Sequence, residues 1–285
     1  MALSDFEIGR LAADDLADAD ALVREAGWNQ TTDDWQTFLD FGTVYTIRDK
    51  GKVIATAATL PYGGKFAWIS MVLIAGYYRR QGLGTKLMRR CLDDLLAAGL
   101  VPVLDATPAG RDVYTGLGFE DCWGYKRLFL NDRKIVPALE SDIAVEAISD
   151  SAWQQLCEYD ASVFGADRRQ ILSRLRGRLP EAEFCVWRGG HIAGFLLGRM
   201  GRKAAQLGPL VADNEEIACA LLAQALETVS PPVYLDFVDD KPLTARLFAT
   251  AGFLAERPLT RMLYKRHESF QDTTQTYAVA GPEFG

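Results

Sequence analysis

The glycine-containing segment Arg79-Arg80-Gln81-Gly82-Leu83-Gly84 restricts the possible folds of this chain more than any other feature. A β-rich run from Phe66 to Ile74 precedes it, and a helical pattern from Thr85 to Ala98 follows it. Glycines lack Cβ atoms, so an anion can approach their backbone closely. The start of a helix also offers free N–H groups and the positive end of the helix dipole. The order of strand, glycine loop and helix therefore predicts a diphosphate-binding turn in an α/β protein.

The spacing of the glycines argues against the common nucleotide-binding motifs. No glycine–lysine–hydroxyl triplet follows the loop, and Leu87 stands where a dinucleotide fingerprint needs its third glycine. The pattern Arg-x-x-Gly-x-Gly instead resembles the CoA-binding motif of the GNAT family of N-acetyltransferases. The segment Tyr114-Thr-Gly-Leu-Gly-Phe119 is similar to that family's Tyr-x-x-x-Gly-Phe segment. Taken alone, the loop has an alternative interpretation as an ordinary strand–helix turn.

The second half of the chain repeats the order of elements in the first. After a polar linker that begins at Asn131, a hairpin, a strand, a helix, a strand and another helix follow. The chain thus resembles tandem members of the family. The resemblance implies an α/β (α+β) fold class with two tandem GNAT-like domains, each a mixed, mostly antiparallel sheet flanked by helices. The expected boundaries are 1–135 for the catalytic domain, 136–266 for the second domain and 267–285 for a C-terminal tail.

The second half has no glycine loop at the matching place. Ala212-Asp-Asn-Glu-Glu216 stands there, and its acids would meet a diphosphate with like charge. We therefore expect a degenerate GNAT-like domain that binds no CoA and covers the acceptor side of the first domain's cleft.

The family resemblance implies acetyl-CoA as co-substrate and direct transfer of its acetyl group to an amine in a ternary complex. Family members splay the strand before the glycine loop from its neighbour, which frees backbone amides for the thioester oxygen. The cofactor-binding residues implied by the resemblance are Val72, Leu73, Ile74, Arg79, Arg80, Gln81, Gly82, Leu83, Gly84 and Thr85.

Two residues are candidates for the proton transfers. The resemblance makes Tyr114 the general acid, because a phenol with a pKa of roughly 10 suits protonation of a thiolate; its alternative role is that of a packed aromatic ring. Many relatives carry a glutamate near the position of Pro102, and an asparagine near that of Thr107. Without that glutamate, Asp105 is the candidate base, and its alternative role is in a turn. Solvent or the second domain could also take the proton.

The acceptor pocket is expected to involve residues from both halves. Trp28 and Asn29 follow the first helix, where the family shapes its acceptor site. Asp33 could attract a cationic amine, although capping of the following helix is the commoner role for an aspartate there. Asp167 and Arg168 could close the pocket from the second domain, or form an ion pair at a helix start.

The composition excludes several other functions. A net charge of -7 offers no basic surface for nucleic acid or an anionic membrane. The five cysteines form no Cys-x-x-Cys pair, and the two histidines lie far apart, so no metal site is expected. No signal pattern or membrane-spanning run is apparent, which predicts a cytoplasmic protein, either a monomer or a homodimer.

The predicted function is acetylation of a small-molecule amine. The alternative is a catalytically inactive CoA-binding sensor or interaction module, which the missing glutamate and the altered asparagine position favour.

Overall fold

A computed structural model describes residues 6–132 and 142–285. The expected boundary at residue 135 and most of the expected linker lie outside the described residues. The strands are β1 (Ile8–Arg10), β2 (Thr43–Asp49), β3 (Lys52–Tyr62), β4 (Phe66–Ile74), β5 (Val101–Ala106), β6 (Phe119–Leu130), β7 (Glu146–Ala147), β8 (Phe184–Arg188), β9 (His191–Met200), β10 (Ala205–Ala212), β11 (Val233–Val238), β12 (Leu254–Tyr264) and β13 (Thr276–Ala278). The helices are α1 (Leu16–Ala26), α2 (Thr32–Phe41), α3 (Leu83–Ala97), α4 (Pro108–Thr115), α5 (Trp153–Phe164), α6 (Arg169–Leu175), α7 (Glu215–Thr228) and α8 (Pro242–Ala251), with 3-10 turns η2 (Ala13–Asp15), η3 (Gly76–Tyr78) and η4 (Pro180–Ala182).

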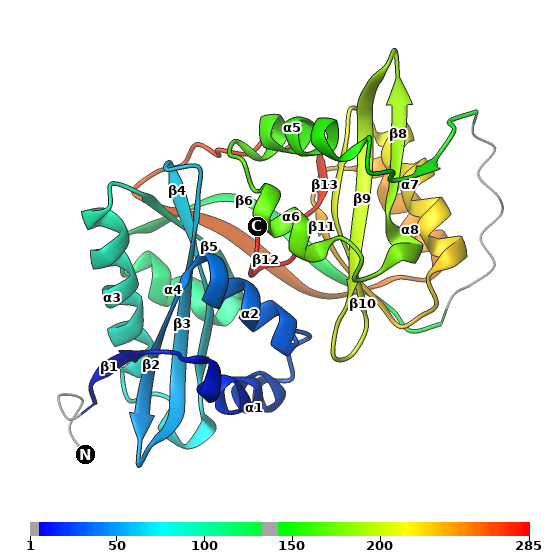
Figure 1. Cartoon of the computed structure of the whole chain (residues 1–285). Coiled ribbons are helices and arrows are strands. Elements are labelled where there is room, and N and C mark those ends of the chain that lie inside the picture. The colour runs from blue at the N-terminus through cyan, green and yellow to red at the C-terminus, as the bar shows by residue number, and fades with distance from the viewer. Residues whose placement is uncertain (1–5, 133–141) are drawn as a thin grey trace.

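All the strands join in one 13-stranded sheet that runs through both halves of the molecule (Figure 1). Its order is β1-β2-β3-β4-β5-β12-β6-β11-β13-β10-β9-β8-β7. Among the described strands, β4 with β5 and β10 with β11 pair in parallel, and the other pairs are antiparallel. The predicted fold class, a mixed and mostly antiparallel sheet flanked by helices, is confirmed. The two sheets expected from the sequence are joined edge to edge.

Strand β12 connects the two halves of the sheet. It comes from the second half of the chain, yet it lies between β5 and β6 of the first half. Strand β6 in turn pairs with β11 of the second half through Val233↔Leu130 to Val238↔Tyr125. The sequence predicts only a short strand at 261–265, because Pro258 and several charged residues interrupt the β pattern before it. The structure extends this strand back to Leu254, where hydrogen bonding to β6 compensates for the weak local signal.

The last ten residues, 276–285, form a buried C-terminal segment where the sequence suggested a tail. They begin with β13, which pairs with β10 and β11, and they end near the centre of the molecule (Figure 1). Side chains of β3 and β4 donate hydrogen bonds to carbonyls of the segment, at 2.7 Å from Tyr62, 3.1 Å from Trp68 and 3.2 Å from Ser70. The segment is therefore part of the first half's core.

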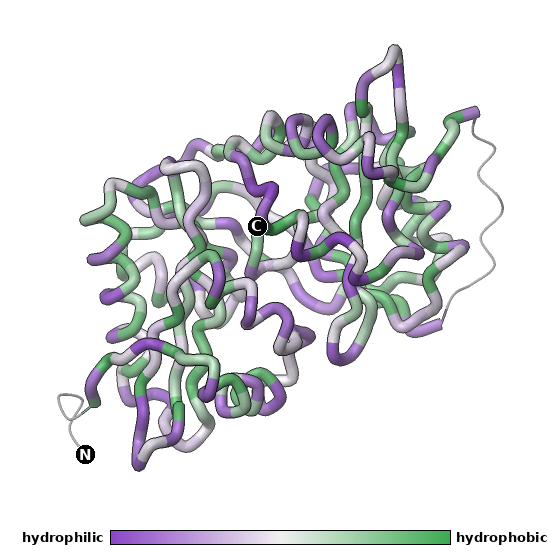
Figure 2. The backbone as a smooth tube through the Cα atoms, in the orientation of Figure 1, coloured by the Kyte–Doolittle hydropathy of each residue, from purple (hydrophilic) through white to green (hydrophobic). Residues whose placement is uncertain are grey.

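Helices cover both faces of the sheet. In the first half, α3 packs on one face and α1 and α2 on the other (Figure 1). The hydrophobic cluster under α1 and α2 continues into α5 and α6 of the second half, for example from Phe38 to Phe164. Figure 2 shows this distribution, with hydrophobic residues along the strands and hydrophilic residues at turns such as the one between β2 and β3. The two halves thus share a core as well as a sheet.

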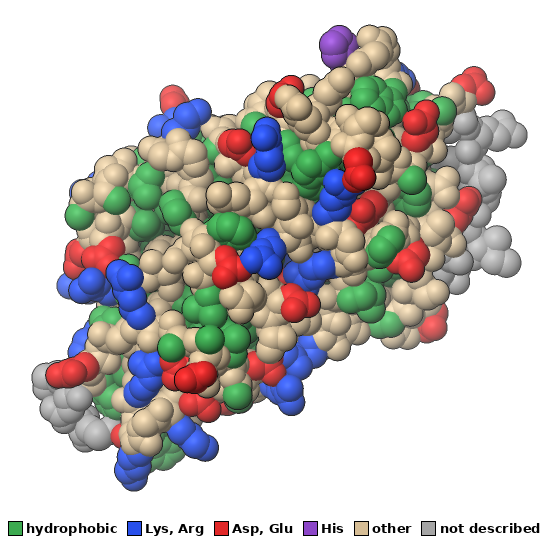
Figure 3. Space-filling view, viewed as in Figure 1, with side chains coloured by type: hydrophobic (Ala, Val, Ile, Leu, Met, Phe, Trp, Pro, Cys, Tyr) green, Lys and Arg blue, Asp and Glu red, His purple; other side chains and the backbone are tan. Residues whose placement is uncertain are grey.

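The surface carries charges of both signs. Figure 3 shows Lys and Arg side chains beside Asp and Glu side chains over this face, without a large area of one sign. Within residues 6–132 and 142–285, none of the helices combines the length and apolar character needed to cross a bilayer.

The Phe284→Ala substitution tests the packing of the C-terminal segment. The Phe284 side chain has no exposed surface, and its ring stacks on Phe38 with 5.4 Å between centroids. Removing it should lower the free energy of unfolding by about 3–5 kcal/mol, measured by chemical unfolding. As a control, Leu254→Ala removes a side chain that is 70% exposed and should cost less than about 0.5 kcal/mol. Equally small losses of unfolding free energy in the two variants would contradict the packing of Phe284 in the core.

Candidate active site

The parallel strands β4 and β5 separate part-way along their length. They pair only from Phe66↔Val101 to Trp68↔Val103. Beyond that point β5 remains paired only with β12, on its opposite edge, and β4 remains paired only with β3. A bulge in β4 accompanies the separation, since Met71 has a φ of 51° and the register to β3 shifts between Ser70 and Leu73. A bulge re-aims the strand and interrupts its ladder. The wedge between β4 and β5 is the splayed geometry expected from the family resemblance.

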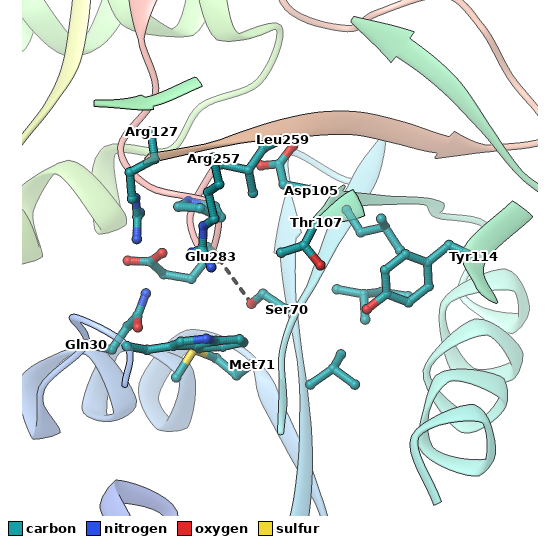
Figure 4. Close-up of a pocket in the computed structure, with 15 residues that line it drawn as sticks. Gln30, Ser70, Met71, Asp105, Thr107, Tyr114, Arg127, Arg257, Leu259 and Glu283 are labelled. Carbon is teal, nitrogen blue, oxygen red and sulfur yellow. Dashed lines mark hydrogen bonds between the residues drawn. The ribbon is translucent and has the colours of Figure 1, made fainter. Parts of the chain in front are cut away.

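A cavity of about 150 Å³ occupies this wedge (Figure 4). Both diverging strands, the loop after α1, α4, β6, β12 and the C-terminal segment contribute to its wall. The lining residues are Trp28, Gln30, Ile69, Ser70, Met71, Val72, Leu104, Asp105, Thr107, Tyr114, Arg127, Arg257, Leu259, Pro282 and Glu283.

Tyr114 lies on α4 at one end of the cavity, and its hydroxyl points inward (Figure 4). Its ring packs edge-on against Phe119, with 6.2 Å between centroids. Gly110 makes room for the ring, because a Cβ there would lie 2.9 Å from a Tyr114 ring atom. Burial raises the pKa of Tyr114 above its usual value. The phenol therefore keeps its proton at neutral pH, the form that a general acid needs.

The glycine loop is at the start of α3, as the sequence predicts. Gly82 is the N-cap residue with a φ of 81°, a left-handed conformation that glycine adopts without strain. No side chain caps this helix start. The N–H groups of its first turn have no acceptors within the helix. A Cβ at Gly84 would meet only the Ile74 side chain, at 3.9 Å. The backbone here is accessible to a diphosphate.

The two loop arginines behave differently. Arg79 donates from Nε to the Ile74 carbonyl at 3.0 Å and lies 3.6 Å from Glu25. Arg80 is exposed, with a left-handed φ of 60°. The residues implied for CoA lie at the end of β4, in the loop that follows and at the start of α3, and Leu73 and Leu83 among them are buried.

In the second half, the corresponding helix is α7, and a side chain caps its start. Asn214 caps α7 by accepting a hydrogen bond from the Ile217 N–H at 3.0 Å. The carboxylate of Glu215 accepts bonds from the N–H groups of Leu243 and Thr244 at the start of α8. Glu215 thus caps the start of α8, and Asp213 accepts a hydrogen bond from the Tyr159 hydroxyl at 2.8 Å.

Asp105, the candidate base expected from the sequence, has its carboxylate paired with an arginine. Both of its carboxylate oxygens accept hydrogen bonds of 2.9 Å from Arg261 on β12. Arg261 lies over the rings of Trp68 and Trp123, at 4.3 and 4.2 Å from their centroids. Both members of the ion pair are buried. Asp105 lines the cavity, but both oxygens of its carboxylate bind Arg261, and this pair links β5 to β12.

Of the three residues between the first helix and the second that were expected at the acceptor site, Trp28 alone lines the cavity. Asn29 is buried elsewhere, and its side-chain oxygen accepts hydrogen bonds from the N–H groups of Lys203 and Ala204 at 2.8 and 3.1 Å. It joins the loop after α1 to the β9–β10 hairpin. Asp33 is exposed in the first turn of α2, a position that favours acidic residues.

Asp167 and Arg168 do not reach the cavity either. Asp167 is exposed and accepts the N–H of Arg169 at 2.8 Å. Arg168 is 2% exposed, makes two 2.8 Å bonds to Asp160 and donates to the Gly285 carbonyl at 2.6 Å. Its bond to Gly285 anchors the C-terminal segment, because a buried guanidinium needs several acceptors.

Several polar residues that line the cavity have no local pattern by which the sequence could have predicted them. Gln30, Arg257 and Glu283 come from three distant parts of the chain, and each has a buried polar atom without a hydrogen-bond partner among the described residues. These atoms are Gln30 Oε1, Arg257 Nε and Glu283 Oε2. Their approach depends on β12 and the C-terminal segment entering the first half. The described residues contain no group of three His, Cys, Asp or Glu side chains arranged for a metal ion.

Comparison with known families identifies both halves of the molecule. Residues 12–119 match the acetyltransferase (GNAT) family model, and residues 156–278 match a second acetyltransferase (GNAT) domain model. The chain is a tandem GNAT protein. It belongs to the GNAT N-acetyltransferases, and proteins similar to it carry that name.

Individual relatives match nearly the whole chain. The uncharacterized N-acetyltransferase YitH of Bacillus subtilis is 19% identical, with 93% of each chain covered. A putative acetyltransferase from Pyrococcus horikoshii shares 19% identity and superposes with a TM-score of 0.79 over 100% of this chain and 98% of its own. A tandem GNAT protein from the clavulanic acid biosynthesis pathway is 16% identical, with a TM-score of 0.64 over 90% of this chain and 98% of its own. At these identities the structures establish a common fold.

The Asp105→Asn substitution tests the structural role of the ion pair. It should lower the free energy of unfolding by about 3–5 kcal/mol, because Arg261 would stay buried without a carboxylate. The control is Asp121→Asn, whose partner Arg111 and own side chain are 50% and 40% exposed. Losing that surface pair should cost at most about 1 kcal/mol in the same unfolding experiment. A similar cost for both variants would show that Asp105 is not needed to hold the sheet.

Proposed function

We propose that this GNAT protein transfers an acetyl group from acetyl-CoA to the amine of a small molecule by direct transfer in a ternary complex. One observation supports the proposal. The wedge between β4 and β5 holds a cavity lined by Tyr114, and β4 leads from that cavity toward the loop before the uncapped start of α3, which is suited to a diphosphate. The limited volume of that cavity, about 150 Å³, favours a small acceptor over a protein chain.

Binding of CoA is assigned to the first half. The N–H groups at the start of α3 would hold the diphosphate, with charge from the exposed Arg80. The pantetheine would then follow the free edge of β4 from Ile74 toward the bulge at Met71. This path ends at the cavity, so the thioester would reach the acceptor site.

The chemistry follows from the groups around the bulge. Backbone N–H groups of β4 near Val72 that β5 does not pair would polarise the thioester carbonyl. The amine nitrogen forms a bond to the acetyl carbon while the C–S bond breaks. Tyr114 supplies a proton to the departing sulfur, and the amine gives up one proton. Since Asp105 is held by Arg261, its carboxylate is a poor candidate to take that proton.

The second half is proposed to be a degenerate GNAT-like domain that binds no CoA and closes the acceptor side. Its α7 start is capped by Asn214, which leaves fewer free N–H groups than at α3. It contributes Arg257 and Glu283 to the cavity wall. With the expected domain limits, residues 1–135 and residues 136–266 would each form part of the cavity wall. Residues 267–285 would complete it.

A CoA-binding sensor without catalysis is the second candidate, because the pairing of Asp105 removes one possible base. Release of free thiol from acetyl-CoA across a library of small amines separates the two. Turnover with any amine supports the enzyme, and binding without turnover on all of them supports the sensor.

The Gly84→Asp substitution tests the CoA site. The wild-type protein should bind one CoA per chain in calorimetry, and the variant should bind at least roughly 100-fold more weakly, since a carboxylate would displace charge-assisted hydrogen bonds to the diphosphate. Because a Cβ at this position has space, the fold should survive. Ala97→Asp, at an exposed position near the other end of α3, is the control and should bind normally. Unchanged CoA affinity in Gly84→Asp would refute the assignment.

The Tyr114→Phe substitution tests the general acid. Turnover should fall by roughly 10²–10³-fold with little change in acetyl-CoA affinity, because the ring still packs but can no longer donate a proton. Tyr234→Phe, on β11 and outside the cavity lining, serves as the control and should turn over normally. If Tyr114→Phe is as active as the wild type, the residue is a packing residue only.

A further inference from the structure

The end of the cavity away from Tyr114 contains charged side chains that are almost all neutralised. Arg127 makes hydrogen bonds of 2.9 and 2.7 Å to Asp236, and Asp105 is paired with Arg261. Glu283 is paired with Arg199. Among the charged side chains that line the cavity, within the described part of the chain, Arg257 alone has no carboxylate within ion-pair distance.

The guanidinium of Arg257 is not fully hydrogen-bonded within the described part of the chain. Its Nε is buried without a hydrogen-bond acceptor. Burial lowers the pKa of Arg257, and the nearby charge of Arg127 lowers it further. A partly buried, unpaired guanidinium is costly, and a bound oxyanion would relieve that cost through paired, charge-assisted hydrogen bonds.

Hydrogen-bond acceptors face the same space from the other side. Glu283 is 2% exposed, and its Oε2 has no partner. Gln30 is 5% exposed, and its Oε1 likewise has none. Figure 4 shows Gln30, Arg257 and Glu283 gathered at this end of the cavity. Buried polar groups are ordinarily satisfied, so unpartnered ones that line a cavity indicate the polar groups of a ligand.

We propose that the acceptor is a small amine that also carries a carboxylate, which Arg257 binds, while Glu283 Oε2 and Gln30 Oε1 accept hydrogen bonds from its N–H groups. This inference rests on the proposed acetyl transfer and names its substrate class. The transfer is balanced as before: the N–C bond forms, the C–S bond breaks, Tyr114 protonates the sulfur and one amine proton leaves to solvent. Acceptors without an anionic group would leave Arg257 uncompensated.

The kinetic test compares each of several amino acids, such as glycine, alanine and β-alanine, with its own carboxamide. For the amino acids that react, kcat/KM in the wild type should exceed that of the carboxamide by about 10–100-fold, the scale of a hydrogen bond to a charged group. The Arg257→Gln substitution should remove most of this preference by raising KM for the amino acid. The amino acid and its carboxamide differ in amine basicity. This difference is the same for the wild type and for Arg257→Gln, so it cancels when the kcat/KM ratios of the two proteins are compared.

Two further variants show whether the preference depends on the charge of Arg257, on the planar shape of its guanidinium, or on general damage to the protein. Arg257→Lys keeps the charge but not the planar fork, so it should restore part of the preference. Arg246→Gln removes an exposed arginine of α8 outside the cavity lining and should leave the preference intact. Arg257→Gln should be at least as stable as the wild type, because it removes an uncompensated charge. A loss of stability in Arg257→Gln would point to a structural role.

A binding experiment tests the site without turnover. In calorimetry with CoA present, N-acetylglycine and N-acetylalanine should bind more tightly than their carboxamides, and Arg257→Gln should abolish the difference. If no amine is turned over but this difference is found, the anion site stands and the acetyl-transfer function fails. If amines are turned over without a carboxylate preference, or if Arg257→Gln keeps the preference, the role of Arg257 is wrong and the transfer function stands.

Discussion

The pairing of β12 with β5 and β6 is the interaction on which the rest of this structure depends. Strand β5 pairs with β4 over only three residues, so its outer half relies on β12 for hydrogen-bond partners. The buried pair of Asp105 and Arg261 lies at neighbouring positions on these two strands. Strand β12 pairs along the edge of β5 opposite to β4, so the outer half of β5 stays held in the sheet where β4 diverges from it. One wall of the wedge is therefore supported by a strand from the other half of the chain.

The same strand exchange determines what the cavity can recognise. Its Tyr114 end is built by the first half, from β4, β5 and α4. Its other end is built from β12 and the C-terminal segment, which bring Arg257 and Glu283 next to the loop after α1. The proposed reacting groups thus belong to one GNAT domain, and two of the three groups proposed to face the acceptor, Arg257 and Glu283, come from the second half of the chain. This division would allow acceptor preference to change without disturbing the CoA loop or the acid.

Buried charge is concentrated along the junction of the two halves. Asp34 meets Arg178 and Arg199, Arg168 meets Asp160, and Arg199 also meets Glu283. Such pairs contribute little net stability, but breaking one leaves an uncompensated charge. They therefore favour one relative arrangement of the C-terminal segment and the two sheets. A cavity whose walls come from several distant segments requires that kind of specificity.

The sequence by itself determined the local structure of the CoA loop and the fold class. Glycines, a preceding β-rich run and a following helix act through contacts between near neighbours, which is why the start of α3 and the strand β4 were predicted closely. It also placed Tyr114, because α4 is positioned by the segment around Phe119. Only the tertiary structure decided the partner of Asp105, the positions of Asn29 and Arg168, and the meeting of Gln30, Arg257 and Glu283. Each of these involves contacts between residues more than 100 positions apart, such as Asp105 with Arg261, Asn29 with Lys203 and Arg168 with Gly285, and one chain carries no local signal for such contacts.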